Sequence, residues 1–260
     1  MRVEHVYRYP VKGLTAEALD EVALLPDELL PWDRAFALAQ GDAPFDPTLP
    51  RFLNKRHFLC LQQNAEAALL RAAFDPRTGM LALRAPGGEA LTEDALAPEG
   101  RARIAAFLTR FLGDAARGAP SFHHVPGHNF ADDETPYVSL IGEATLRDLE
   151  ARVGARRDRL RFRANLYVSG AAPWAEFDWI GQELQVGTAR LRIERRIRRC
   201  PAINVNPETA ARDAKPLLEL REHYGHADLG VYGRVIEGGT VAPGSGVEVL
   251  GVGIGSDHVE

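Results

Sequence analysis

The sequence is poor in cysteine, with only Cys60 and Cys200 among its 260 residues. Two thiols cannot supply the disulfide framework that stabilises small secreted domains. The opening residues Met1-Arg2-Val3-Glu4 lack the basic and apolar regions of a secretory signal. We therefore expect the protein to work in the reducing environment of the cytoplasm.

Long apolar runs and a strong charge bias are also missing. No run approaches the roughly 20 apolar residues that a membrane-spanning helix needs, so no membrane partner is expected. The net charge of -5 gives no sign of a nucleic-acid-binding surface. Lysine is scarce, with three lysines among the 31 basic residues. Because arginine is so common in this chain, only clustered arginines indicate a function.

Nucleotide-binding glycine loops and a serine nucleophile elbow are absent as well. The chain instead contains short strand-like runs separated by Gly and Pro turns, with few helices. This pattern is typical of β-barrels and sandwiches and predicts a mainly β protein with helices, of the α+β class. The strands are predicted at 3–9, 35–40, 58–62, 80–84, 137–141, 165–168, 183–186, 189–195, 231–237 and 247–250.

Apolar residues at helical spacing predict four helices, over 65–74, 99–112, 143–153 and 216–223. Residues 114–136 are rich in Ala, Gly, Pro, His and Asp, which indicates a linker with a loop. We place a domain boundary near residue 120. The chain is thus expected to form a β-rich N-terminal domain over 1–120 and a β-barrel domain over 121–260.

Cys200 follows two arginines and precedes a proline, in the run Arg198-Arg199-Cys200-Pro201. Adjacent positive charge favours the thiolate, which is the form that attacks electrophiles and binds soft metals. Most free cysteines, however, are small buried core residues. The local sequence leaves both interpretations open.

Clustered arginines precede this cysteine. Arg190 and Arg192 alternate with apolar residues and indicate a strand with one wet face. The alternation then breaks, so some of the later arginines should face an interior or a cleft, where a bound anion would compensate their charge. A solvated arginine face is the alternative. The later arginines are Arg195, Arg196, Arg198 and Arg199.

A second polar cluster precedes the predicted strand at 137–141. Its spacing matches no metal-ligand pattern, and histidines are common in loops, so we favour an ordinary surface loop over a metal site. The cluster contains His123, His124, His128, Asp132, Asp133 and Glu134.

Several motifs follow one another along nearly the whole chain. They are Tyr9–Gly13, Trp32–Arg34, Asp133–Pro136, Phe162–Asn165, Glu176–Trp179, Arg199–Pro201, Val205–Thr209 and Leu229–Tyr232. In this order they resemble the MOSC domain family, with its N-terminal β-barrel domain in front. The resemblance implies that 1–120 is this N-terminal domain and that 121–260 is the MOSC domain.

The family includes the mitochondrial amidoxime reducing component and its bacterial relatives, which bind the molybdenum cofactor, a pterin dithiolene with a phosphate. The resemblance therefore implies this cofactor, and pyridoxal phosphate is not expected. Cys200 would be the thiolate ligand of molybdenum, and Asp133 would handle protons beside it. The residues implied to bind the cofactor are Lys12, Gly13, Arg34, Glu134, Thr135, Arg163, Asn165, Arg198, Arg199 and Tyr232.

The chain departs from the family pattern at a few positions. Gly13 stands where relatives often have serine, Ala164 where they have proline, and Asn206 where they have aspartate. Asn204 stands near a position where relatives usually have threonine. These differences leave the substrate class open.

The resemblance implies an oxidoreductase that reduces N-hydroxylated small molecules. Two cysteines cannot supply the four ligands of an iron–sulfur cluster, so a separate flavin or iron–sulfur protein would deliver the electrons. The alternative is a sulfur or cofactor carrier that uses Cys200 as a persulfide or as a ligand. A third interpretation is a β-barrel whose site binds no cofactor.

Overall fold

The computed structural model describes residues 1–251. Strands predominate, and α-helices are few, which confirms the α+β class. The α-helices are α1 (Pro98–Leu112), α2 (Glu143–Val153) and α3 (Pro216–Tyr224). The strands are β1 (Arg2–Arg8), β2 (Glu17–Ala18), β3 (Val22–Leu24), β4 (Phe36–Ala39), β5 (Arg71–Asp75), β6 (Met80–Arg84), β7 (Ala90–Asp94), β8 (Ser121–His124), β9 (Val138–Gly142), β10 (Leu166–Ser169), β11 (Glu183–Val186), β12 (Ala189–Arg198), β13 (Asp228–Glu237), β14 (Gly239–Val241) and β15 (Val247–Gly251).

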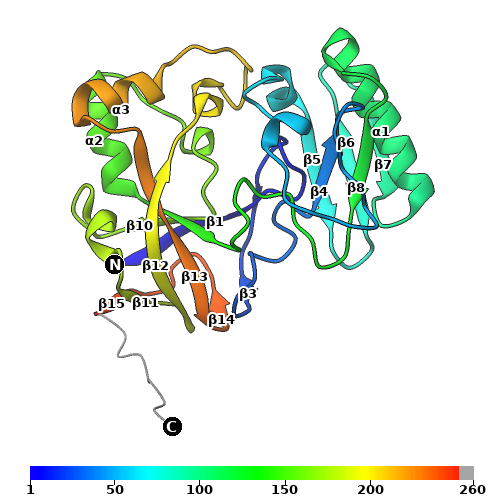
Figure 1. Cartoon of the computed structure of the whole chain (residues 1–260). Helices are drawn as coiled ribbons and strands as arrows, with labels where there is room; N and C mark the ends of the chain where they lie inside the picture. The colour runs from blue at the N-terminus through cyan, green and yellow to red at the C-terminus, as the bar shows by residue number, and fades with distance from the viewer. Residues whose placement is uncertain (252–260) are drawn as a thin grey trace.

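The largest sheet has eight strands and curls around one apolar core (Figure 1). Its order is β15-β11-β12-β13-β9-β10-β1-β2, and only β9 and β10 pair in parallel. Backbone hydrogen bonds from Val3 N to Ser245 O (2.9 Å) and from Val247 N to Met1 O (2.9 Å) join the beginning of β1 to the region of β15. These bonds close the curled sheet into a barrel.

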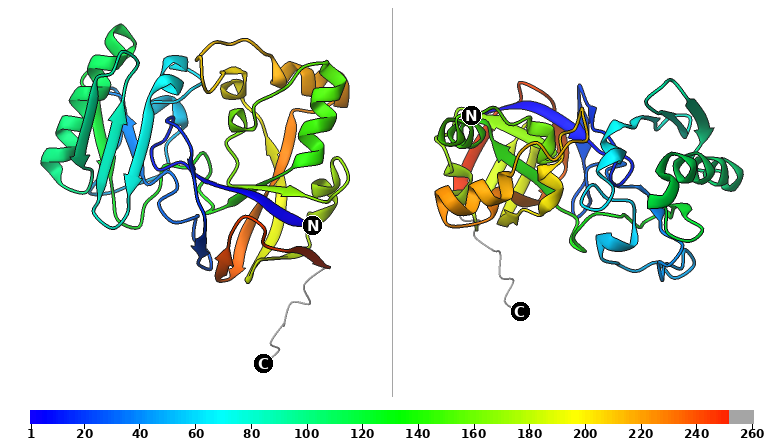
Figure 2. Two further views of the ribbon diagram at one scale, coloured as in Figure 1. Left: turned by 180° about the vertical axis from the view of Figure 1, so that it is seen from behind. Right: turned by 90° about the horizontal axis from the view of Figure 1, so that it is seen from above.

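A smaller group of strands packs beside this barrel. The sheet β5-β6-β7 and the pair β4-β8 share an apolar core with α1, which covers their outer side (Figure 2). The buried residues of α1 recur at helical spacing, as the sequence predicts, and include Ile104, Phe107 and Leu108. The chain therefore forms two neighbouring apolar cores.

The N-terminal segment contributes to both cores. Strand β1 pairs with β10, and β3 pairs with β14, so strands from before residue 120 complete the barrel built by later strands. The domain limits 1–120 and 121–260 remain predictions, because the large sheet takes strands from both sides of residue 120.

The helices predicted over 99–112, 143–153 and 216–223 are present as α1, α2 and α3. Glycines follow all three, and Gly154 and Gly225 adopt the left-handed conformation that ends a helix. None of the helices within residues 1–251 has the length and apolar character needed to cross a membrane.

Three local predictions were wrong. The helix predicted over 65–74 is a 3-10 turn at Ala65–Leu69 followed by β5, because pairing with β6 outweighs the local helix propensity. The strand predicted over 58–62 is reduced to a bridge between Ala39 and Phe58. The segment 114–136 is not only a loop, since it contains β8, which pairs with β4.

Candidate functional site

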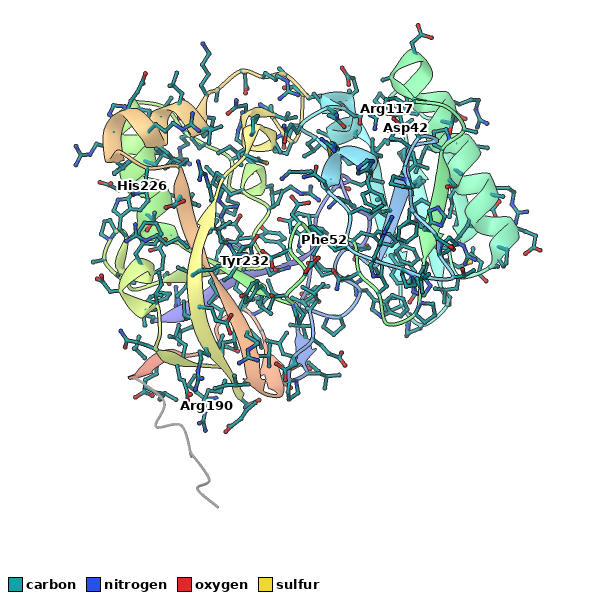
Figure 3. The ribbon with its side chains drawn as sticks, viewed as in Figure 1. Asp42, Phe52, Arg117, Arg190, His226 and Tyr232 are labelled. Atoms are coloured by element: carbon teal, nitrogen blue, oxygen red, sulfur yellow. The ribbon has the colours of Figure 1, made fainter. Side chains whose placement is uncertain are left out.

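A cavity of about 270 Å³ is lined by residues from both halves of the chain. Tyr232 of β13 lies on its wall near the middle of the molecule (Figure 3). Glu134 is exposed and is not part of the wall. The other predicted site residues all line the cavity: Lys12, Gly13, Arg34, Asp133, Thr135, Arg163, Asn165, Arg198, Arg199, Cys200 and Tyr232.

The cavity is strongly basic, although the whole chain carries a net charge of -5. Only three acidic side chains line it, Asp33, Asp132 and Asp133. The eight basic side chains on its wall are Lys12, Arg34, Lys55, Arg161, Arg163, Arg195, Arg198 and Arg199. This excess of positive charge favours an anion in the cavity.

Arg34 and Arg163 lie against the ring of Tyr9, with guanidinium carbons 4.4 and 4.3 Å from its centroid. Both arginines have a φ of 51°, a conformation that is uncommon outside glycine and that clusters at functional sites. Arg34 donates to the carbonyl of Arg163 (3.0 Å) and pairs with Asp33, whereas Arg163 donates to the carbonyl of Leu14 (2.6 Å). Burial, with Arg34 nearby, lowers the pKa of Arg163 to about 10, so it remains a cation at neutral pH.

Arg199 enters the cavity beside Cys200. Its guanidinium donates to the carbonyls of Phe162 (2.8 Å) and Leu229 (2.8 Å). Burial disfavours the charge of Arg199 and lowers its pKa. Gly230 makes this position possible, because a Cβ there would lie 2.5 Å from the Leu140 carbonyl and 3.2 Å from Arg199 Nη2.

The arginine run thus divides into arginines outside the cavity and arginines that line it. Arg190 and Arg192 pair with Glu183 on the outer face of the barrel, which agrees with a solvated face. Arg196 stacks on Phe177 at 4.1 Å. The remaining three arginines of the run line the cavity, as an anion site requires, and they are Arg195, Arg198 and Arg199.

Three cavity arginines form no ion pair within residues 1–251. The hydrogen-bond partners of Arg163 and Arg199 are main-chain carbonyls, and Arg198 is exposed on the wall. Buried cations without a counter-charge are costly unless an anion joins them. These three guanidinium groups are therefore available to a bound anion.

Cys200 ends β12 and precedes a short 3-10 turn at Pro201–Asn204. Its thiol is half-buried and lines the cavity. Cys60 lines the same cavity but is buried, and burial raises the pKa of its thiol. Arg212 holds the two segments together, since it donates to the carbonyls of Pro201 (3.5 Å) and Gln62 (2.8 Å). Cys200 is the more accessible of the two thiols.

Two lysines, Lys12 and Lys55, line the cavity together with this thiol. Only Lys12 was predicted from the sequence. Asp132 accepts from Lys12 Nζ (2.5 Å) and Lys55 Nζ (2.9 Å). Burial disfavours the charge of Lys55, but the Asp132 carboxylate with which it pairs raises its pKa above its usual range. One signal could have indicated this site: two of the three lysines of the chain meet here.

The predicted proton-handling group, Asp133, pairs with Arg195 and accepts from the Thr135 amide (3.1 Å). Arg195 lies over the ring of Tyr232 at 4.8 Å, and this ring stacks on Tyr137 with centroids 5.0 Å apart. Asp133 is therefore fixed at the cavity wall beside an aromatic pair.

Asn165 is buried, and its amide is already bonded. Its Oδ1 accepts from Ser139 Oγ (2.7 Å), and its Nδ2 donates to the Tyr7 carbonyl (3.2 Å). The residue lines the cavity but also joins β1, β9 and β10. Gly13 has a φ of 84°, and a Cβ there would lie 2.8 Å from the Leu59 carbonyl, so the backbone favours glycine.

The three histidines lie among aromatic side chains. His123 and His128 contact Phe45, and His124 stacks near Trp32 and Phe36. Burial lowers the pKa of all three rings. Within residues 1–251, no group of three His, Cys, Asp or Glu side chains is placed to hold a metal ion. The surface-loop interpretation was wrong for His123 and His124, which lie on β8.

Comparison with known families identifies both halves of the chain. The MOSC N-terminal beta barrel domain matches residues 1–115, and the MOSC domain matches residues 126–248. The two matches take in most of the chain, and they follow the order of the sequence motifs. The chain belongs to the MOSC domain family.

Individual relatives are more distant. Mitochondrial amidoxime-reducing component 1 of Mus musculus is 30% identical over 131 residues, which is 46% of this chain and 38% of the mouse protein. Molybdenum cofactor sulfurase of Danio rerio is 37% identical over 91 residues, which is 35% of this chain and 10% of that protein. The chain therefore matches less than half the length of these relatives.

Two solved structures are also similar. The YUAD protein from Bacillus subtilis aligns over 95% of this chain and 94% of its own, with 14% identity and a TM-score of 0.45. YiiM from Geobacillus stearothermophilus aligns over 45% of this chain and 56% of its own, with 19% identity and a TM-score of 0.36. Membership of the family, together with the relatives named for amidoxime reduction and as molybdenum cofactor sulfurase, supports a function related to the molybdenum cofactor.

Proposed function

We propose that the cavity binds the molybdenum cofactor and that the protein reduces N-hydroxylated small molecules with electrons from a separate flavin or iron–sulfur protein. We further propose that it acts in the cytoplasm. The relatives named for amidoxime reduction support the reaction, and the family supports the cofactor.

One observation carries the proposal: an accessible thiol shares a cavity with three arginines that have no ion pair within residues 1–251. A thiolate is a suitable ligand for a soft transition metal, and guanidinium groups suit a phosphate. The donors in the cavity therefore fit both ends of a metal-bearing, phosphate-bearing cofactor.

The residues of the cavity would divide the work. Cys200 would ligate the metal, and Arg163, Arg198 and Arg199 would hold the anionic part. When bound, the cofactor would supply the two-electron chemistry that removes oxygen from nitrogen. Asp133 would exchange protons at its carboxylate, which Arg195 holds at the wall.

The test is metal and pterin analysis of protein purified from a molybdenum-replete host. The native protein should carry about one molybdenum and one pterin for each protein chain. Cys200→Ala should lose most of the metal. Cys60→Ala is the thiol control and should retain it. Full retention of molybdenum and activity in Cys200→Ala would contradict the proposal.

The phosphate contact has a matched pair of variants on one strand. Arg198 lines the cavity, whereas Arg196 stacks on Phe177 outside it, and both side chains are exposed. Arg198→Ala should reduce the pterin content about tenfold, in line with loss of a charge-assisted contact of about 1.5 kcal/mol. Arg196→Ala should leave it unchanged.

A carrier of sulfur or of the cofactor is the second candidate, and the accessible Cys200 thiol favours it. Mass spectrometry of native protein distinguishes the two, because a persulfide on Cys200 without molybdenum would indicate a sulfur carrier. Stoichiometric pterin without reductase activity from an artificial electron donor would indicate cofactor storage. A protein with no persulfide, no molybdenum and no pterin would be a barrel whose site binds no cofactor.

A further inference from the structure

We propose that Lys55 makes the approach to the Cys200 sulfur selective for negatively charged reactants. For the reductase proposed above, on which this extension rests, the physiological substrate would then be an N-hydroxylated compound that carries a carboxylate or another anionic group. The ammonium of Lys55 would contact that group.

The position of Lys55 is fixed by its backbone. It begins a 3-10 turn (Lys55–His57) that Asn54 caps through the Arg56 amide (3.1 Å). Arg117 donates to the Arg56 carbonyl (2.6 Å) and links the same turn to the loop that precedes β8. The lysine side chain therefore projects into the cavity from a segment that is held on both sides.

Lys55 stands at the open end of the lysine pair. Its side chain is 25% exposed and that of Asp132 is 47% exposed, whereas the Lys12 side chain is only 6% exposed. Lys12 lies deeper, and its ammonium donates to the Phe130 carbonyl (2.6 Å) as well as to Asp132. A molecule that enters from solvent therefore meets Lys55 before it meets Lys12.

The ammonium of Lys55 keeps donors free. It has three N–H groups, of which Asp132 takes one. The others can donate to an anion in the cavity that Cys200 also lines. The arginines without ion pairs, Arg163 and Arg199, are held against other carbonyls, so an anionic cofactor group and an anionic substrate group would have separate partners.

Alkylation of Cys200 in cofactor-free protein tests the local field directly. Iodoacetate and iodoacetamide both react by attack of the thiolate on the CH₂ carbon, forming a C–S bond as iodide leaves. They differ in charge, so the ratio of their rates cancels the thiolate fraction. Rates at Cys200 are read by peptide mass spectrometry, which reports Cys60 separately.

The iodoacetate-to-iodoacetamide ratio at Cys200 should exceed that of glutathione. Lys55→Gln should lower it about fivefold, as expected for losing about 1 kcal/mol of attraction to one nearby cation in a well-solvated site. Lys55→Arg should keep the ratio high, and Arg56→Gln, on the neighbouring exposed residue, should leave it unchanged. A ratio at or below that of glutathione, or an unchanged ratio in Lys55→Gln, would overturn the proposal.

The substrate class is tested with the loaded enzyme and a matched pair of amidoximes. One carries a para carboxylate and the other a para carboxamide of nearly the same shape. Lys55→Gln should raise KM for the carboxylate about fivefold and leave KM for the carboxamide unchanged. Equal changes for both would overturn the substrate assignment, while failure of the cofactor proposal would appear as missing molybdenum and leave the alkylation result intact.

Discussion

Asp132 is the counter-charge of a buried lysine, so its removal should affect stability as well as the site. In Asp132→Asn, the buried Lys12 ammonium would lose its charged partner and keep only the Phe130 carbonyl. We expect the free energy of unfolding to fall by about 1–3 kcal/mol. Asp42→Asn is the control, since Asp42 pairs with Arg117 at the exposed surface (Figure 3), and it should change stability by less than about 0.5 kcal/mol. Urea unfolding measures both; equal losses would contradict the assignment.

The same carboxylate predicts a pH dependence. Burial opposes the ionised form of Asp132, but Lys12 and Lys55 outweigh it and hold its pKa well below the ordinary value of 3.8. A lowered pKa in the folded state contributes stability above 3.8, and this contribution is lost as the pH falls below it. The difference in unfolding free energy between the native protein and Asp132→Asn should therefore shrink as the pH falls from 5 towards 3. A difference that stays constant over this range would show that Asp132 acts through shape and not through charge.

Single residues of the site could be predicted only where neighbours in the sequence carry the signal. Cys200 and Arg199 adjoin each other, and their charge pattern raises a reactive thiol and an anion site as one of two open interpretations, while the family resemblance implies the metal ligand. Lys55 and Asp132 are 77 residues apart and meet only because β4 and β8 pair and bring their flanking segments together. No local pattern encodes such a contact.

Among the elements, β13 shapes the site through a glycine. Gly230 has a φ of 79°, and a Cβ there would lie 2.5 Å from the Leu140 carbonyl of β9. Gly230→Ala should therefore add a steric clash of about 1–3 kcal/mol to the backbone strain. Gly244→Ala is the control, because Gly244 has a φ of 92° but nothing within 4 Å of a Cβ. Urea unfolding should show the larger loss for Gly230→Ala; equal losses would show that β13 and β9 can separate at no cost.

The helices were predictable because each has a complete local code of apolar spacing and a terminating glycine, as α2 does with Gly154. The error at 65–74 arose because the alanines of this segment favour a helix, whereas Arg71–Asp75 forms a half-exposed strand in which only Phe74 is buried. Strand β5 is decided by its partner β6, which the turn at 75–79 folds back onto it. The partner is a tertiary feature that the segment itself does not specify.

The whole molecule is tied together by the N-terminal strand. Strand β1 is an integral part of the barrel, and the chain then continues into the neighbouring core through Val11. Conversely, Val205 of the second half packs within the core that contains α1. Because each half supplies residues to the other's core, we expect the two to unfold together.

Val6 of β1 tests this coupling, since it is 1% exposed within the barrel core. Val6→Ala should lower the free energy of unfolding by about 2 kcal/mol through lost burial and a small cavity. Single-tryptophan variants give separate reports: Trp179 lies in the barrel core, and Trp32 packs against the neighbouring core. Both tryptophans should show the same urea midpoint, and Val6→Ala should shift both equally, because a cooperative unit transmits a local loss to every probe. If the midpoint moved for Trp179 but not for Trp32, the two cores would unfold independently, and the coupling through β1 would be contradicted.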